Sequence, residues 1–306
     1  MHTDILYGGA WGTRIRVVLT VLLVATVIYT VVLNALAGPG FFPFKHSTGY
    51  VSDKLFICIT PAGYTFSIWA AIYVSLILIA IYAIALLFLK VCEVKVWKLG
   101  GAVPSSLILV LIINLNLNVG WLFAWDNISV TASAIILVLI VITNGTALSL
   151  SACSFAKDAA SLYTKSKFNF WCGILVINGL LLYSTWTTFA STINQSIFYK
   201  YELKLDGNSV CLCALSFLVV GFVVWFVLEN TVFTLVANPF LTHYIVLLWA
   251  IVGIYMEQKD IVSTEVSALI TTTIVVAAVL FLTRIFLLIY RNRENGIYKN
   301  TVLLLK

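Results

Sequence analysis

Asparagine and tryptophan recur at helical spacing inside long apolar segments, where few other side chains could do chemistry. Asn114, Asn118, Trp121 and Trp125 follow one another at steps of four, three and four residues, which places them on one face of a helix. An amide surrounded by apolar groups needs a hydrogen-bond partner, so we expect this face to turn towards other helices. The simpler alternative is that these amides only hold helices together.

Two other segments show the same pattern. Trp69 and Tyr73 are four residues apart, as are Trp186, Ala190 and Asn194. Three helices that present rings beside amides favour an apolar pocket with a few polar groups, which is the usual design of a small-molecule site. The candidate ligand-binding residues are Trp69, Tyr73, Asn118, Trp121, Trp186, Phe189, Ala190 and Asn194.

The same segments carry no general base, so we predict no catalytic residue. The three histidines are scattered along the chain, and no metal site is predicted. The first six apolar segments contain no ionisable residue, which counts against ion coupling. His243 is expected to be a hydrogen-bonded interior residue, and Arg284 is expected to extend towards the cytoplasmic face.

Composition indicates the class of protein that must position these residues. Hydrophobic residues make up 62% of the chain and charged residues 10%, against about 45–50% and about 25% in soluble domains. We therefore predict an all-α, polytopic membrane helix bundle. Segments of about 20 apolar residues are needed to cross a bilayer, and eight are expected, at Val17–Ala37, Tyr64–Leu89, Ser105–Trp125, Ile128–Cys153, Phe170–Ile193, Val210–Leu228, Pro239–Met256 and Ser267–Tyr290.

The distribution of basic residues predicts the orientation. With both termini in the cytoplasm, thirteen of the eighteen Lys and Arg residues lie on the inner side, as the positive-inside rule requires. The lipid bilayer is then the main partner. A nucleic-acid partner is not expected, because no basic face exists away from the membrane boundary. Asn238 and Pro239 resemble the start of the seventh helix.

The six cysteines form no CxxC pair, and the simplest interpretation is that they are small buried apolar residues. Cys58 and the pair Cys211 and Cys213 all fall on the predicted outer side, so one disulfide there is the alternative. The aromatic segment 38–60 is also on this side. It is interpreted either as a lid on the bundle or as part of an interfacial aromatic belt, and it contains Phe41, Phe42, Phe44, Tyr50 and Phe56.

Three motifs resemble the TspO/MBR family, the translocator or tryptophan-rich sensory proteins. Residues 60–69 (TPAGYTFSIW), continuing to Tyr73, resemble the start of that family's second helix. Residues 118–123 (NVGWLF) resemble its helix-three Asn-x-x-Trp segment, and residues 186–194 (WTTFASTIN) its helix-five segment. Only Pro61 remains of the family's Pro-Pro pair, and the aromatic residue after it is one place out of register.

The resemblance covers about residues 17–197 and looks like a longer branch of the family. It implies a five-helix membrane domain at 1–197, followed at 198–306 by three further transmembrane helices and a short cytoplasmic tail. It also implies that Trp69 and Trp186 match pocket tryptophans linked to porphyrin breakdown by light. Ala190 and Asn194 match helix-five positions associated with ligand and sterol binding.

These observations favour a non-enzymatic membrane receptor or carrier for a planar hydrophobic ligand such as a porphyrin or haem, with a sterol as a further ligand class. The alternative is an eight-helix transporter of a small solute. A porphyrin-modifying enzyme that works through tryptophan photochemistry is a minor third hypothesis. No bound cofactor is predicted, and a homodimer is left open.

Overall fold

Each long apolar segment forms a helix, because a helix satisfies every backbone polar group within the segment itself. The computed structural model describes residues 10–91, 94–95, 101–238 and 240–295. The elements in chain order are α2 (Ala10–Ala37), α3 (Thr48–Lys54), the 3-10 helix η1 (Gly63–Ser67), α4 (Ile68–Phe88), β1 (Lys90–Val91), β2 (Val94–Lys95), α5 (Ser105–Asp126), α6 (Val130–Lys165), α7 (Lys167–Tyr201), α8 (Gly207–Thr231), α9 (Thr234–Ala237), α10 (Thr242–Gln258) and α11 (Thr264–Asn295). β1 and β2 form one short antiparallel pair.

The polytopic all-α bundle is confirmed, and the chain is an integral membrane protein. Among the described residues, seven helices are long and apolar enough to cross a membrane: α2, α4, α5, α6, α7, α8 and α11. α10 occupies the place of the remaining expected span. Its 17 residues rise about 25 Å at 1.5 Å each, which is shorter than a hydrocarbon core of about 30 Å.

The start of α10 differs from the prediction. The helix begins at Thr242, and Asn238 is not its N-cap; Pro239 lies outside the described residues. Asn178 of α7 replaces a local cap, because its side-chain oxygen accepts from the backbone N–H groups of Leu241 and Thr242, both at 3.2 Å. The Thr242 hydroxyl also donates to the Asn178 carbonyl at 2.7 Å. Tertiary packing therefore supplies the capping that the sequence pattern assigned to its own neighbours.

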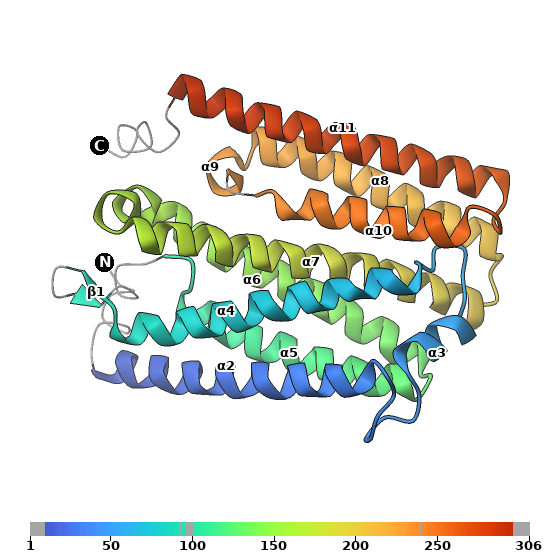
Figure 1. The fold of residues 1–306 in the computed structure, drawn as a ribbon, viewed down its shortest axis with the longest axis horizontal. Helices are drawn as coiled ribbons and strands as arrows, with labels where there is room; N and C mark the ends of the chain where they lie inside the picture. Colours follow the sequence, from blue (N-terminus) through green and yellow to red (C-terminus); the bar gives the residue numbers. More distant parts are fainter. Residues whose placement is uncertain (1–9, 92–93, 96–100, 239, 296–306) are drawn as a thin grey trace.

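The central element of the bundle is α7, which packs against α4, α6, α8 and α10. α2, α4 and α5 lie on one side of it, and α8, α10 and α11 lie on the other (Figure 1). α2 begins and α11 ends at one end of the bundle, which we call the inner end. α3 lies at the opposite end, which we call the outer end.

The segment between α3 and α4 connects the two sides at the outer end. The Ala62 N–H donates to the Gly253 carbonyl of α10 at 3.0 Å. The Trp249 indole N–H donates to the Thr65 carbonyl at 2.9 Å. Gln258, which is fully buried, donates to two carbonyls of the same segment. α10 is thus bonded directly to the segment that precedes α4, including η1.

The cysteines differ from the simplest interpretation. Cys58 and Cys211 form a disulfide between the outer segment and the start of α8, which was the alternative. Cys153 and Cys213 are exposed and Cys172 is half-buried, so burial was wrong for these. Cys213 lines a hollow between α6, α7 and α8 instead of packing in the core. Cys92 lies outside the described residues.

Candidate ligand-binding site

A cavity of about 350 Å³ lies at the outer end of the bundle. Apolar atoms make up most of its wall, and the segment 38–63 covers it from outside. α10 contributes to the wall as well as α2, α4 and α5, so the cavity is not built from the first five long helices alone. Its lining residues are Asn34, Gly38, Thr48, Gly49, Ser52, Asp53, Thr60, Pro61, Gly63, Phe66, Trp69, Tyr73, Trp121, Leu122 and Glu257.

A narrower space of about 30 Å³ continues from this cavity towards α7. The two spaces share Phe66, Trp69 and Trp121 in their walls. The inner space adds the residues predicted on α7, namely Trp186, Ala190 and Asn194. Trp69 and Trp186 come from helices far apart in the sequence, and only tertiary packing places them at one site.

The aromatic rings around this space form two groups of contacting rings, one around Trp69 and Trp186 and the other formed by Trp121 and Trp125. Trp69 stacks on Tyr73 with centroids 5.5 Å apart, as one turn of α4 requires. Trp69 also meets Trp186 edge to face at 6.4 Å, and Phe66 meets Trp186 in the same way at 6.0 Å. Trp121 stacks on its own helix neighbour Trp125 at 5.6 Å. Such contacts fix the orientations of the rings that line the space.

Some polar atoms of the site have no protein partner. Among the described residues, the Trp186 indole nitrogen and the Tyr73 hydroxyl are buried without a hydrogen bond. The Trp186 side chain is only 2% exposed. A buried donor without a partner costs free energy, so a ligand that supplies an acceptor would bind here with an added advantage.

Two predicted site residues lie outside the cavity wall. Asn118 is buried and accepts from the Asn34 amide at 2.9 Å, so it positions Asn34, which does line the cavity. Phe189 stacks on Phe222 of α8 at 5.9 Å and lines neither space. The remaining candidates Trp69, Tyr73, Trp121, Trp186, Ala190 and Asn194 are brought together.

The phenylalanines of the segment that covers the cavity differ in burial. Phe44 is buried and stacks on Phe123 of α5 at 5.0 Å, whereas Phe41 and Phe42 are exposed. The backbone N–H groups of Lys45 and His46 both donate to the Asp126 carboxylate, at 2.9 and 2.8 Å. Phe44 therefore docks this loop on α5, whereas Phe41 and Phe42 do not; the lid and the interfacial belt both stay predictions.

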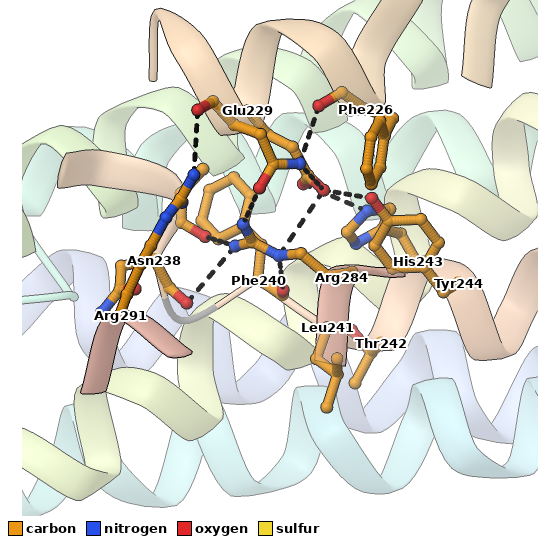
Figure 2. A network of polar contacts seen from close by, with 12 residues as sticks. Phe226, Glu229, Asn238, Phe240, Leu241, Thr242, His243, Tyr244, Arg284 and Arg291 are labelled. Atoms are coloured by element: carbon orange, nitrogen blue, oxygen red, sulfur yellow. Dashed lines mark hydrogen bonds and ion pairs between the residues drawn. The ribbon is translucent and has the colours of Figure 1, made fainter. Parts of the chain in front are cut away.

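A buried charged network at the inner end was not predicted from the sequence (Figure 2). Glu229, near the end of α8, is fully buried, and its carboxylate lies 3.6 Å from Arg284 Nε and 3.3 Å from His243 Nε2. The Tyr244 hydroxyl donates to the same carboxylate. The predicted sixth span ended at Leu228, one residue before Glu229, and this boundary hid the carboxylate.

Arg284 does not extend to the cytoplasmic face, and that prediction was wrong. The side chain is fully buried. Its guanidinium donates to the Asn230 side chain at 2.8 Å and to the Ala237 carbonyl at 2.6 Å. The last turn of α8 supplies Asn230, and α9, in the connection from α8 to α10, supplies Ala237. His243 is interior, as expected, with Glu229 as its neighbour.

Two further hollows lie between α6, α7 and α8. One, of about 320 Å³, has Trp225 and His243 in its wall, and the other, of about 770 Å³, reaches Asp206 at the outer end. Thr188 and Phe217 line both. Within the described part of the chain, no group of three or more His, Cys, Asp or Glu side chains could hold a metal ion.

The comparison with protein families agrees with the three motifs and extends beyond them. The family model described as TSPO-like protein matches residues 20–286. This match passes residue 197 and includes α8, α10 and most of α11, so the likeness is not confined to the first five long helices. No curated protein and no solved structure matches the chain. The matched region covers most of the sequence, and the chain therefore belongs to the family of TSPO-like proteins.

Proposed function

We propose that this protein is a non-enzymatic membrane receptor or carrier that binds a flat hydrophobic ligand in the Trp- and Asn-lined cavity. A porphyrin is the leading ligand class, and a sterol is the other. The observation that carries the proposal is the meeting of Trp69, Trp121 and Trp186, from three separate helices, around one covered space. Flat π-systems bind between such rings by stacking, and the Asn34 and Asn194 amides would orient a polar edge.

The orientation with both termini in the cytoplasm is part of the proposal. The disulfide between Cys58 and Cys211 supports it, because disulfides persist on the oxidising side of a membrane. The cavity lies at the same end as this disulfide, so a ligand would reach it from outside the cytoplasm or from the outer leaflet.

The test is a titration of the purified full-length protein with a series of porphyrins, followed by absorbance and tryptophan fluorescence. Saturable binding with a shifted Soret band and quenched tryptophans is expected. Binding that never saturates, and that empty detergent micelles reproduce, would contradict a specific cavity.

A second candidate function is solute transport, and Glu229 is the observation that favours it. A carboxylate buried at membrane depth is a functional candidate by default, whereas the apolar spans predicted from the sequence contained none. His243 lies beside this carboxylate and also lines the hollow between α6, α7 and α8. Flux of labelled small solutes into proteoliposomes, compared between the native protein and Glu229→Gln, tests this function. Equal flux in empty liposomes would eliminate it.

A further inference from the structure

The wall of the outer cavity carries negative charge without a matching positive charge. Asp53 of α3 and Glu257 of α10 both line it, whereas its lining includes no Lys, Arg or His. Among the described residues, neither carboxylate has an ion pair or a hydrogen bond to its side chain. Asp53 is exposed and Glu257 is half-buried; Lys54 and Lys259 follow them closely in the sequence and are exposed, but neither lysine lines the cavity.

The rings of the same cavity also attract positive charge. The face of an indole or phenol ring is electron-rich and binds a cation at up to about 6 Å from its centroid. Trp69, Tyr73 and Trp121 line the cavity together with the two carboxylates. Aromatic faces beside unpaired carboxylates form the kind of site that recognises organic cations, because the rings replace water around the charge and the carboxylates neutralise it.

The inner end of the space, next to Trp186, favours a hydrogen-bond acceptor and not a positive charge. The Trp186 indole N–H is buried, and within the described part of the chain it has no acceptor. A ligand that reached from the mouth to Trp186 would therefore place an acceptor or a π face inside and its positive charge outside. The volume of about 350 Å³ lies at the lower end of the usual range for ligand pockets, about 300–1,000 Å³, and suits a body of a few fused rings.

We propose that the cavity selects flat hydrophobic cations, such as aromatic amines and quaternary nitrogen heterocycles, over neutral and anionic ligands of the same shape. This inference rests on the proposed function, since it specifies the ligand class of the same cavity. It also ranks the porphyrins: cationic porphyrins bind more tightly than those that carry carboxylates, because Asp53 and Glu257 repel a carboxylate at the mouth.

The test compares three probes of one shape at pH 8 in an uncharged detergent: N-methylacridinium as the cation, acridine as the neutral form and acridine-9-carboxylate as the anion. Binding is followed by probe fluorescence and tryptophan quenching. We expect affinity to fall in the order cation, neutral, anion. A unit charge about 4 Å away in water is worth about 1 kcal/mol, so each carboxylate should contribute about fivefold.

Glu257→Gln is the decisive variant, and Asp260→Asn is its matched control. Asp260 is exposed near the same end of α10 and is not part of the cavity wall. Glu257→Gln should weaken N-methylacridinium about fivefold and leave acridine unchanged, and the unchanged neutral probe shows that the variant is folded. Asp260→Asn should change neither affinity.

Two contrary outcomes are distinguishable. If acridine binds the native protein as tightly as N-methylacridinium, or if Glu257→Gln weakens both equally, selection for cations is wrong while the cavity remains a binding site. If none of the three probes and no porphyrin binds, the proposed function fails together with this inference.

Discussion

Trp186 has two roles that a single substitution can separate. It packs in the core, and it also lines the inner part of the cavity with an unpartnered N–H. The first role affects the free energy of unfolding, and the second affects ligand affinity. Affinity measured on the folded variant therefore reports the proposed ligand contact separately from packing.

Trp186→Leu should weaken porphyrin binding about 5- to 150-fold, because stacking on a flat π-system is worth about 1–3 kcal/mol. Trp171→Leu on the same helix is the control, since Trp171 is exposed. Combining Trp186→Leu with Trp69→Leu should give losses that do not add, because both rings would touch one ligand. Full affinity in the monodisperse double variant would remove the cavity from the proposal.

Glu229 and Arg284 form a buried ion pair, and removing one charge leaves the other without its partner. Glu229→Gln should therefore destabilise the protein by about 3–5 kcal/mol, seen as a lower midpoint of thermal unfolding in detergent. Glu265→Gln is the control, because Glu265 is exposed at the start of α11. An unchanged midpoint for Glu229→Gln would mean that the pair contributes nothing net to stability.

At the scale of elements, α10 packs tightly against η1 at Gly253. A Cβ atom added at Gly253 would lie 2.1 Å from the Thr65 hydroxyl oxygen, and the Gly253 carbonyl accepts from Ala62. The absence of a side chain at this position lets α10 approach η1, which carries Phe66 into the cavity wall. The geometry of the cavity thus depends on a glycine in a different helix.

Gly253→Ala should lower stability by about 1–3 kcal/mol, which is the usual cost of overpacking, and should also weaken ligand binding. Gly221→Ala is the matched control, since a Cβ there meets nothing within 4 Å. An alanine at that helical position should raise stability by about 0.5–1 kcal/mol. Thermal unfolding of both variants gives opposite signs if the contact at Gly253 is as tight as the structure shows.

The second prediction at this scale concerns the loop over the cavity and the rate of ligand release. Phe44→Ala removes the stacking on Phe123, which is worth about 0.5–1.5 kcal/mol for such a pair, and should speed ligand release by about 2- to 13-fold. Phe42→Ala should leave release unchanged, because Phe42 is 90% exposed. Stopped-flow displacement measures both rates. Equal release from the two variants would show that the loop does not hold the ligand.

For the whole molecule, the membrane topology can be tested by labelling residues next to the two ends of α7. Lys165 and Lys204 are both exposed and flank opposite ends of α7, since Lys165 is the last residue of α6 and Lys204 follows α7. Cysteines introduced at these positions, with Cys92, Cys153, Cys172 and Cys213 replaced by alanine, should react with a membrane-impermeant maleimide from opposite sides. The Lys204 site should react from outside the cytoplasm. Labelling of both sites from one side would overturn the arrangement of the spans.

The membrane class and most spans could be predicted from the sequence, because the bilayer acts on local composition. A segment of apolar residues long enough to cross it must form a helix whatever its neighbours are. Helical spacing likewise predicted that Asn114, Asn118, Trp121 and Trp125 turn inward, and all four are buried. The motifs around Trp69 and Trp186 predicted the family for the same reason, since they are local patterns.

Only the tertiary structure decided which side chains meet. Glu257 lines the cavity and Glu229 pairs with Arg284 through contacts between residues distant in the sequence. Cys211, and not Cys213, faces Cys58 because of the rotation of α8 about its axis. In the sequence, a charged residue such as Glu229 marks the end of a predicted span, because a charge is costly in lipid. That cost falls when another helix supplies the partner, and the sequence of one helix does not specify what its neighbours supply.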